Sequence, residues 1–326
     1  MVVPMNLSET SGQTPPKRRA RWPRLLLAAI VIWFFGDFCY SCYVGYRIRQ
    51  WKASVPWTAD GLAPDAAERE KGEGGVALLM VHGFGDSPQM YRKLLPELAN
   101  HDYYCKAILL PGFGKDVETY AASEVEDWLR KVKEEMAALK ESHRQVWIVA
   151  HSLGGAISIN HCLNQQDSGS DAAMPDGLLL LAPAIEVSNQ RSPIFPTRFW
   201  HEWSKYALPS SRITCSPFPM DARDPAEQER EYRNIFSPRS IVTNTFTLID
   251  ANRGRASELS LPTLVVLAKQ DRVVDSAATE KFFEQIGGPD KELLRLEQSG
   301  HNVPVDVEWE TVTDAIKTFL AEHPPS

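Results

Sequence analysis

A serine, a histidine and an aspartate each follow a short apolar run of this sequence, an arrangement that could support nucleophilic catalysis. Ser152 lies within Ala-His-Ser-Leu-Gly at 150–154, between an apolar run and a segment of helical pattern. This spacing is close to that of a G-x-S-x-G turn, in which a sharp bend between strand and helix exposes the serine oxygen. The residues two before and two after the serine approach each other closely, so both must be small. Gly154 meets that requirement fully and Ala150 nearly so.

His301 and Asp271 are the predicted partners of Ser152. A serine nucleophile needs a general base, and the base needs a carboxylate that orients it. His301 follows the apolar run 292–297, and Asp271 follows the run 264–268. Because the carboxyl ends of parallel strands meet at one edge of a sheet, we expect the three side chains to converge. The sequence therefore predicts a catalytic triad of Ser152, Asp271 and His301.

Other residues of the same types offer alternatives to this triad. Asp275, four residues beyond the predicted acid, and Glu186, after the fourth apolar run, could each orient the base instead. His143, His161 and His201 fall in expected helices or in an aromatic insertion, and we interpret them as structural or solvated.

The stabilisation of an oxyanion is assigned to two backbone amides. His-Gly-Phe-Gly at 82–85 follows the first apolar run, and its glycines allow the backbone to approach a reacting carbonyl. The amide of Phe84 is one candidate donor, and the amide of Leu153, at a helix N-terminus, is the other. The predicted substrate-binding residues are Phe84, His151, Phe195 and Phe199. We expect no cofactor and no metal, because the sequence carries no metal-ligand, Walker or dinucleotide motif.

Alternating strands and helices must position these residues. Short continuous apolar runs, typical of strands buried on both faces, are expected to form strands at 76–81, 105–110, 145–150, 177–183, 264–268 and 292–297. Helices are predicted at 88–98, 123–139, from the serine turn to 163, at 277–286 and at 307–321. This alternation indicates an α/β fold with a mostly parallel sheet covered on both faces by helices.

The stretch 186–260 interrupts the alternation between the fourth and fifth strands. It is rich in proline and aromatic residues, among them Phe195, Phe199, Trp200 and Trp203. An insertion of this length is usually functional or an additional subdomain. Its aromatic residues could form a small core of their own, or they could cover an apolar pocket as a lid.

The N-terminal segment 25–46 predicts a transmembrane helix. Twenty-two residues at 1.5 Å each span about 33 Å, which matches a hydrocarbon core of about 30 Å. Asp37 costs about 2.5–3.5 kcal/mol at the centre of such a helix, and nine Leu, Ile, Val and Phe residues at about 0.3–0.6 kcal/mol each roughly offset it. Tyr40, Tyr43 and Tyr46 suit an aromatic belt at the far interface.

Two alternatives to a membrane anchor remain open: a cleaved signal peptide, although no Ala-x-Ala-like site follows, and a buried or interfacial helix. If the segment spans a membrane, the basic tail 1–24 favours a cytoplasmic N-terminus. The catalytic body would then lie outside, on the periplasmic side of an inner membrane, joined through a linker at 47–74.

Composition excludes several other classes of protein. The 326 residues carry a formal charge of −7, yet the tail holds five cations against Glu9, so the remainder is strongly acidic. Without a dense basic stripe, we expect no nucleic-acid binding. Five irregularly spaced cysteines form neither a disulfide framework nor a zinc pattern.

Taken in order, the motifs resemble those of α/β-hydrolases, specifically bacterial carboxylesterases and monoacylglycerol lipases. The resemblance covers about 75–322 and rests on HGFGDSP, LLPGFGKD, AHSLGGA, LLLLAPA, VLAKQDRVV and EQSGHNVPVD. It implies an α/β-hydrolase core at 75–185 and 261–326, a helical lid at 186–260 and serine acyl hydrolysis. Ala150 departs from the usual glycine, and Gly-Phe-Gly at 112–114 stands where many relatives have Gly-His-Gly.

The expected function is therefore that of a membrane-anchored serine hydrolase that cleaves lipophilic carboxylic esters, either monoacylglycerols or medium-chain esters. The expected partners are a small-molecule or lipid ester substrate and the membrane, which the N-terminal helix would contact, while the oligomeric state stays open. An acyltransferase or a thioesterase could use the same triad. The non-enzymatic alternative is a binding protein that has the hydrolase scaffold but does not catalyse a reaction.

Overall fold

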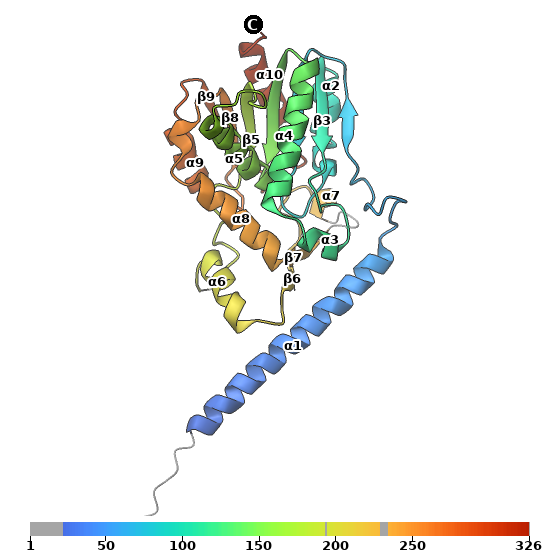
Figure 1. Cartoon of the computed structure of the whole chain (residues 1–326), viewed down its shortest axis with the longest axis vertical. Helices are drawn as coiled ribbons and strands as arrows, with labels where there is room; N and C mark the ends of the chain where they lie inside the picture. The colour runs from blue at the N-terminus through green and yellow to red at the C-terminus, as the bar shows by residue number, and fades with distance from the viewer. Residues whose placement is uncertain (1–21, 193, 229–233, 326) are drawn as a thin grey trace, which may run out of the picture.

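A computed structural model describes residues 22–192, 194–228 and 234–325, with a seven-stranded sheet at its centre (Figure 1). The strand order is β1-β3-β2-β4-β5-β8-β9, and β1 pairs antiparallel with β3 while the other pairs are parallel. The strands are β1 (Arg69–Lys71), β2 (Val76–Val81), β3 (Tyr103–Ile108), β4 (Gln145–His151), β5 (Gly177–Leu181), β8 (Thr263–Ala268) and β9 (Lys291–Leu296). The predicted mostly parallel sheet is confirmed, and each of the six predicted strands is present within about two residues of its expected bounds.

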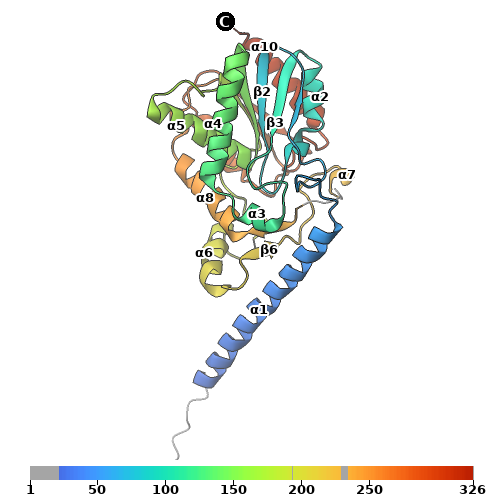
Figure 2. The ribbon, with the colours of Figure 1, turned by 45° about the vertical axis from the view of Figure 1, so that its right-hand side comes forward.

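Helices cover both faces of this sheet, as the apolar character of the strands requires. Figures 1 and 2 place α4 and α5 on one face and α2 and α10 on the other. Around the sheet lie η1 (Pro88–Tyr91), α2 (Leu94–Ala99), α3 (Val117–Ala121), α4 (Val125–Ser142), α5 (Leu153–Ser168), α9 (Ser276–Gln285) and α10 (Trp309–Glu322). α4 buries Trp128, Val132, Met136 and Leu139, a spacing that forms one apolar stripe along a helix.

Two local features differ from the prediction. β1 lies inside the segment expected to be a linker at 47–74. β1 is a short strand at the edge of the sheet, and such strands are often charged. Its sequence, Arg-Glu-Lys, therefore shows none of the apolar residues by which a strand is recognised. The helix predicted at 88–98 is divided into η1 and α2. Pro96 explains the break, since it has no N–H to donate to the preceding turn and is tolerated only in the first turn of the new helix.

The inserted segment 186–260, called the cap below, is mostly helical. It contains α6 (Thr197–Ala207), β6 (Ile213–Cys215), α7 (Pro225–Gln228), β7 (Phe236–Pro238), α8 (Arg239–Asn252) and η2 (Ala256–Glu258). α8 is tied to α5 by a hydrogen bond of 2.8 Å from the Asn252 side chain to the Ala156 carbonyl. α6 packs on α8 through His201, whose ring centroid lies 5.1 Å from that of Phe246.

The N-terminal helix α1 (Trp22–Ser54) extends beyond the predicted 25–46 at both ends and passes beside the cap (Figure 1). Within the described part of the chain, it is the one helix whose length and composition suit a membrane span. Most of its apolar side chains are exposed, whereas Asp37, Val44 and Ile48 are buried against the rest of the protein. The predicted basic tail lies outside the described residues, apart from its last three.

Candidate active site

Ser152 occupies a strained turn between β4 and α5. Its φ of 53° and ψ of −117° lie in a region that non-glycine residues rarely adopt. The Ser152 amide donates to the Leu181 carbonyl at 3.0 Å, which ties the turn to β5. Gly154 allows the close approach of β2, because a Cβ at this position would lie 2.2 Å from the Val81 carbonyl oxygen. The sharp turn expected from the sequence is therefore present.

Ser152, His301 and Asp271 form a hydrogen-bonded row at the carboxyl ends of their strands. His301 Nε2 lies 2.8 Å from Ser152 Oγ, and His301 Nδ1 lies 2.7 Å from Asp271 Oδ2. The other oxygen of Asp271 accepts hydrogen bonds from the Val273 and Val274 amides at 2.7 and 2.9 Å. All three side chains of the row are buried. This geometry suits a hydroxyl that passes its proton to an imidazole held by a carboxylate.

The alternative residues lie elsewhere. Asp275 caps α9 by accepting from the Ala277 amide at 2.9 Å, and Glu186 forms ion pairs with Arg198 and Arg253. His143 stacks on Tyr104, His161 contacts the Ala173 carbonyl, and His201 lies between α6 and α8.

The loop after β2 brings Gly83 beside Ser152, and His82 holds this loop in place. The Leu110 amide donates to His82 Nε2 at 3.1 Å, so Nδ1 carries the hydrogen and donates to the Gly83 carbonyl at 3.0 Å. Burial lowers the pKa of His82 to about 4, which keeps the ring neutral. A Cβ on Gly83 would lie 2.9 Å from the Cβ of Ser152, so the close approach of this loop requires glycine.

His151 supports the His301 loop from the residue before the serine. Its Nε2–H donates to the His301 carbonyl at 3.0 Å, and the two ring centroids lie 4.9 Å apart. Burial, followed by repulsion from a charged His301, lowers the pKa of His151 to about 3. His151 is therefore a neutral neighbour of His301.

Asp221, a residue of the cap, joins the loops that carry His301 and Asp271. Its Oδ2 accepts from the Arg272 amide at 2.8 Å and from the His301 amide at 3.3 Å. Its Oδ1 pairs with Arg191 at 2.8 Å, and its carbonyl accepts from the Asn302 amide at 3.1 Å. Asp221 was not predicted from the sequence, because a single acid in a long irregular insertion belongs to no motif.

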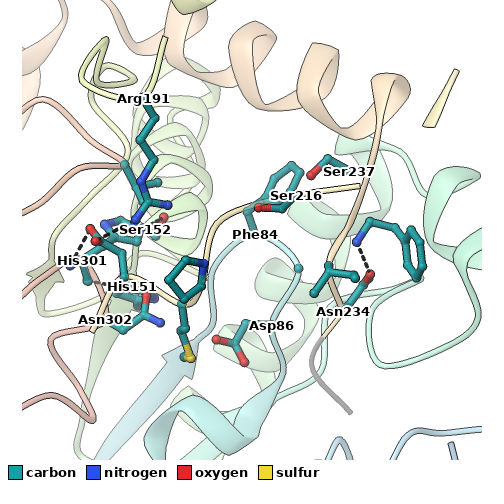
Figure 3. Close-up of a pocket in the computed structure, with 17 residues that line it drawn as sticks. Phe84, Asp86, His151, Ser152, Arg191, Ser216, Asn234, Ser237, His301 and Asn302 are labelled. Atoms are coloured by element: carbon teal, nitrogen blue, oxygen red, sulfur yellow. Dashed lines mark hydrogen bonds and ion pairs between the residues drawn. The ribbon is translucent and has the colours of Figure 1, made fainter. Parts of the chain in front are cut away.

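A cavity of about 230 Å³ opens onto Ser152 and His301 (Figure 3). Phe84 and His151 line it, and Arg191, Asp86 and Asn234 add polar groups. The other lining residues are Gly85, Ser216, Pro219, Met220, Asp221, Ile235, Phe236, Ser237, Val273 and Asn302.

Phe195 and Phe199 are not among the described residues that line the cavity, so their role in substrate binding stays a prediction. Both are almost half exposed, and they pack on each other with ring centroids 4.6 Å apart. The reason is the orientation of α6, which turns His201 inward to α8 and leaves its phenylalanine outside.

Within the described ranges, no group of three or more His, Cys, Asp or Glu side chains is arranged to hold a metal ion.

Comparison with known proteins gives a family for this arrangement. The chain is 22% identical over 250 residues to a thermostable monoacylglycerol lipase of Bacillus sp. (strain H-257), covering 77% of this chain and 92% of that protein. It is 23% identical over 249 residues to a carboxylesterase of Bacillus subtilis (strain 168), covering 76% and 93%. The solved structure of Paleococcus ferrophilus monoacylglycerol lipase superposes with a TM-score of 0.65 at 20% identity, covering 79% and 98%. Residues 75–308 match the family described as serine aminopeptidase, S33. The chain thus belongs to the serine aminopeptidase S33 family of α/β-hydrolases.

Proposed function

We propose that this protein is a membrane-anchored serine esterase that cleaves lipophilic carboxylic esters through an acyl-enzyme. The observation that carries the proposal is the buried row of Ser152, His301 and Asp271 at the floor of a cavity. The monoacylglycerol lipase and the carboxylesterase to which the chain is similar support an ester as the substrate.

In this proposal each residue of the site takes part in a defined step of the reaction. Ser152 Oγ attacks the acyl carbonyl carbon as His301 Nε2 takes its proton, and Asp271 stabilises the imidazolium that forms. The amides of Phe84 and Leu153 hold the oxyanion, and losing one such donor costs about 2.7–4 kcal/mol. His301 then protonates the departing alkoxide, which leaves as the alcohol. Water, deprotonated by His301, attacks the acyl-enzyme and releases the carboxylic acid and free Ser152.

The volume of the cavity supports an ester with a medium-length acyl chain, and its polar lining supports a monoacylglycerol among such esters. A volume of about 230 Å³ lies below the roughly 300–1,000 Å³ typical of sites for drug-sized ligands, so a long acyl chain would have to extend outside it. Arg191, Asp86 and Asn234 supply polar contacts that suit a hydroxylated leaving group.

α1 supports anchoring in a membrane with the N-terminus inside and the catalytic body outside. Its exposed apolar side chains need a nonpolar environment, and its contacts with the cap favour retention over removal as a signal peptide. The cations that precede the apolar segment outnumber those that follow it, which supports the orientation.

Labelling with a fluorophosphonate tests the nucleophile directly. The full chain in detergent should be labelled and Ser152→Ala should not, with Ser158→Ala as a control for a serine buried in the next turns of α5. Labelling of Ser152→Ala at the wild-type rate would contradict the assignment.

A series of p-nitrophenyl esters then tests the substrate class. We expect kcat/KM to rise from acetate to octanoate and to fall for palmitate presented in monomeric form. A steady decline from acetate onward would contradict the lipophilic preference. Amino-acid p-nitroanilides and transfer to an added alcohol are the comparison assays, and a faster reaction in either would replace the esterase assignment.

A further inference from the structure

Asp37 is a buried carboxylate in the apolar helix α1, and the cap supplies all of the hydrogen bonds described for it. The Ser210 amide donates to Oδ2 at 2.8 Å, while the Ser211 amide and hydroxyl donate to Oδ1 at 3.2 and 2.5 Å. Only 3% of Asp37 is exposed, and Ser211 is buried with it. A buried charge is tolerated when several donors satisfy it, so this contact is specific to the pairing of α1 with the cap.

Further contacts extend this attachment along α1. Trp33 Nε1 donates to the Ala207 carbonyl at 2.7 Å, and Ser41 Oγ donates to the Ser210 carbonyl at 2.9 Å. The Cys215 amide donates to the Tyr40 hydroxyl at 3.3 Å. About one turn of α1 on either side of Asp37 therefore holds the segment from the end of α6 to β6, and we call this set of contacts the Asp37 clamp.

The clamp lies where the exposed surface of α1 changes character. From Trp22 to Phe38, the large apolar side chains of α1 are 44–80% exposed, over a length of about 25 Å. Tyr40, Tyr43 and Tyr46 follow, and exposed tyrosines are typical of the boundary between lipid and water. Asp37 thus lies near the end of the apolar stretch that faces the expected boundary between lipid and water.

α6 lies on the apolar side of this boundary. Trp203 of α6 meets Trp33 edge to face, with ring centroids 5.6 Å apart, and Trp33 is one helical turn, about 6 Å, deeper than Asp37. The large apolar side chains exposed on this part of the cap are Ile194, Phe195, Phe199, Trp203 and Tyr206. They continue the exposed apolar surface of α1, and Figure 1 shows α6 beside the middle of that helix.

We propose that the Asp37 clamp fixes the cap to the anchor so that α6 lies in the boundary layer of the same lipid bilayer that α1 spans. The partner of the exposed surface of α6 is the bilayer itself, because that surface is continuous with the surface of the proposed membrane span. This inference rests on the proposed function. It adds that the anchor is a structural element of the cap, which places the cavity of Ser152 beside the membrane surface.

Hydrogen exchange measured on the full chain in lipid nanodiscs tests the clamp without depending on activity. In Asp37→Ala the Ser210 and Ser211 amides lose their acceptor, so peptides over 208–212 should exchange at least tenfold faster. Asp60→Asn, which removes an exposed charge beyond the end of α1, should leave these peptides unchanged. Equal exchange in Asp37→Ala and the wild type would overturn the clamp.

A charge on the exposed face of α6 tests its place at the bilayer. Tyr206 is 80% exposed, so Tyr206→Glu disturbs little packing. We expect at least a tenfold loss of hydrolysis of a monoacylglycerol embedded in phosphatidylcholine vesicles, with hydrolysis of soluble p-nitrophenyl acetate within twofold of wild type. Val307→Glu, a charge on an exposed apolar position of the body, is the control.

The outcomes separate this inference from the proposed function. If Tyr206→Glu hydrolyses the vesicle substrate at the wild-type rate, α6 does not contact the bilayer and the inference is wrong. If the wild type hydrolyses neither ester, the esterase assignment fails, while the exchange experiment still decides whether Asp37 binds the cap.

Discussion

Replacing Asp221 by asparagine removes one charge from a residue that joins the cap to both loops of the proposed catalytic row. The carboxylate accepts the Arg272 and His301 amides on one oxygen and pairs with Arg191 on the other. An asparagine of the same shape keeps one acceptor oxygen. Its NH₂ group must then face either the guanidinium or the two amides, and all of these are donors.

The magnitude follows from the contacts that are lost. Asp221 is 7% exposed, and breaking a buried ion pair by removing one partner costs about 3–5 kcal/mol. Asparagine keeps half of the hydrogen bonds, so we expect the free energy of unfolding to fall by about 2–3 kcal/mol. Because Asp221 holds the amide of His301, we also expect the imidazole to lose its alignment with Ser152, with a loss of about 10- to 100-fold in reactivity.

The rate constant of fluorophosphonate labelling is the decisive assay, because it reports the reactivity of Ser152 in the folded protein with little dependence on substrate binding. Asp221→Asn should be labelled 10- to 100-fold more slowly than the wild type at a temperature where both are folded. Asp290→Asn, an exposed acid before β9, is the matched control. A variant that is less stable but is labelled at the wild-type rate would refute a positioning role and leave Asp221 as a structural residue only.

Two further predictions concern the loop beside the serine and the buried histidines. Gly83→Ala places a methyl group 2.9 Å from the Cβ of Ser152, so kcat should fall by about 10²–10³-fold with little change in circular dichroism; a loss below threefold would show that the loop can shift freely. Burial lowers the pKa of His82 to about 4 and of His151 to about 3, so below about pH 6.5 the unfolded chain binds protons that the folded chain does not. Urea unfolding should therefore show stability falling by roughly 3–4 kcal/mol from pH 7 to pH 5, and a flat profile would contradict neutral burial of the two rings.

Much of the fold and the meeting of Ser152, His301 and Asp271 could be predicted because both depend on local patterns. A strand buried on both faces is a continuous apolar run, and such runs placed β2, β4 and β8 within two residues of their bounds. Chain order and strand ends then predicted which serine, histidine and aspartate would meet. β1 could not be found in this way, since a three-residue edge strand of charged residues resembles a loop.

The cap was predicted less well because its orientation depends on tertiary contacts. An amphipathic pattern shows that α6 has an apolar face, but it does not show whether that face lies over the cavity or away from it. Phe199 was predicted to contact the substrate because it lies in an aromatic insertion that could cover a pocket, whereas in the structure it is almost half exposed and is not among the described residues that line the cavity. Asp221 accepts hydrogen bonds from the backbone amides of residues that are distant in sequence. Any residue type can supply such an amide, so these contacts produce no recognisable sequence motif.

Asp37 shows why a hydropathy sum can misjudge a proposed membrane helix. The cost of about 2.5–3.5 kcal/mol applies to an aspartate on a single helix that faces lipid. In this structure the carboxylate faces the cap and accepts three hydrogen bonds, and a hydrogen bond to a charged group contributes about 1.5–3 kcal/mol. A change such as Asp37→Leu would therefore make α1 more hydrophobic and at the same time release Ser210 and Ser211. Hydropathy alone predicts that this variant is better anchored, and the clamp predicts a cap that is held less firmly. The residue that weakens the prediction of a membrane helix from sequence is thus the residue that gives the helix a specific place in the fold.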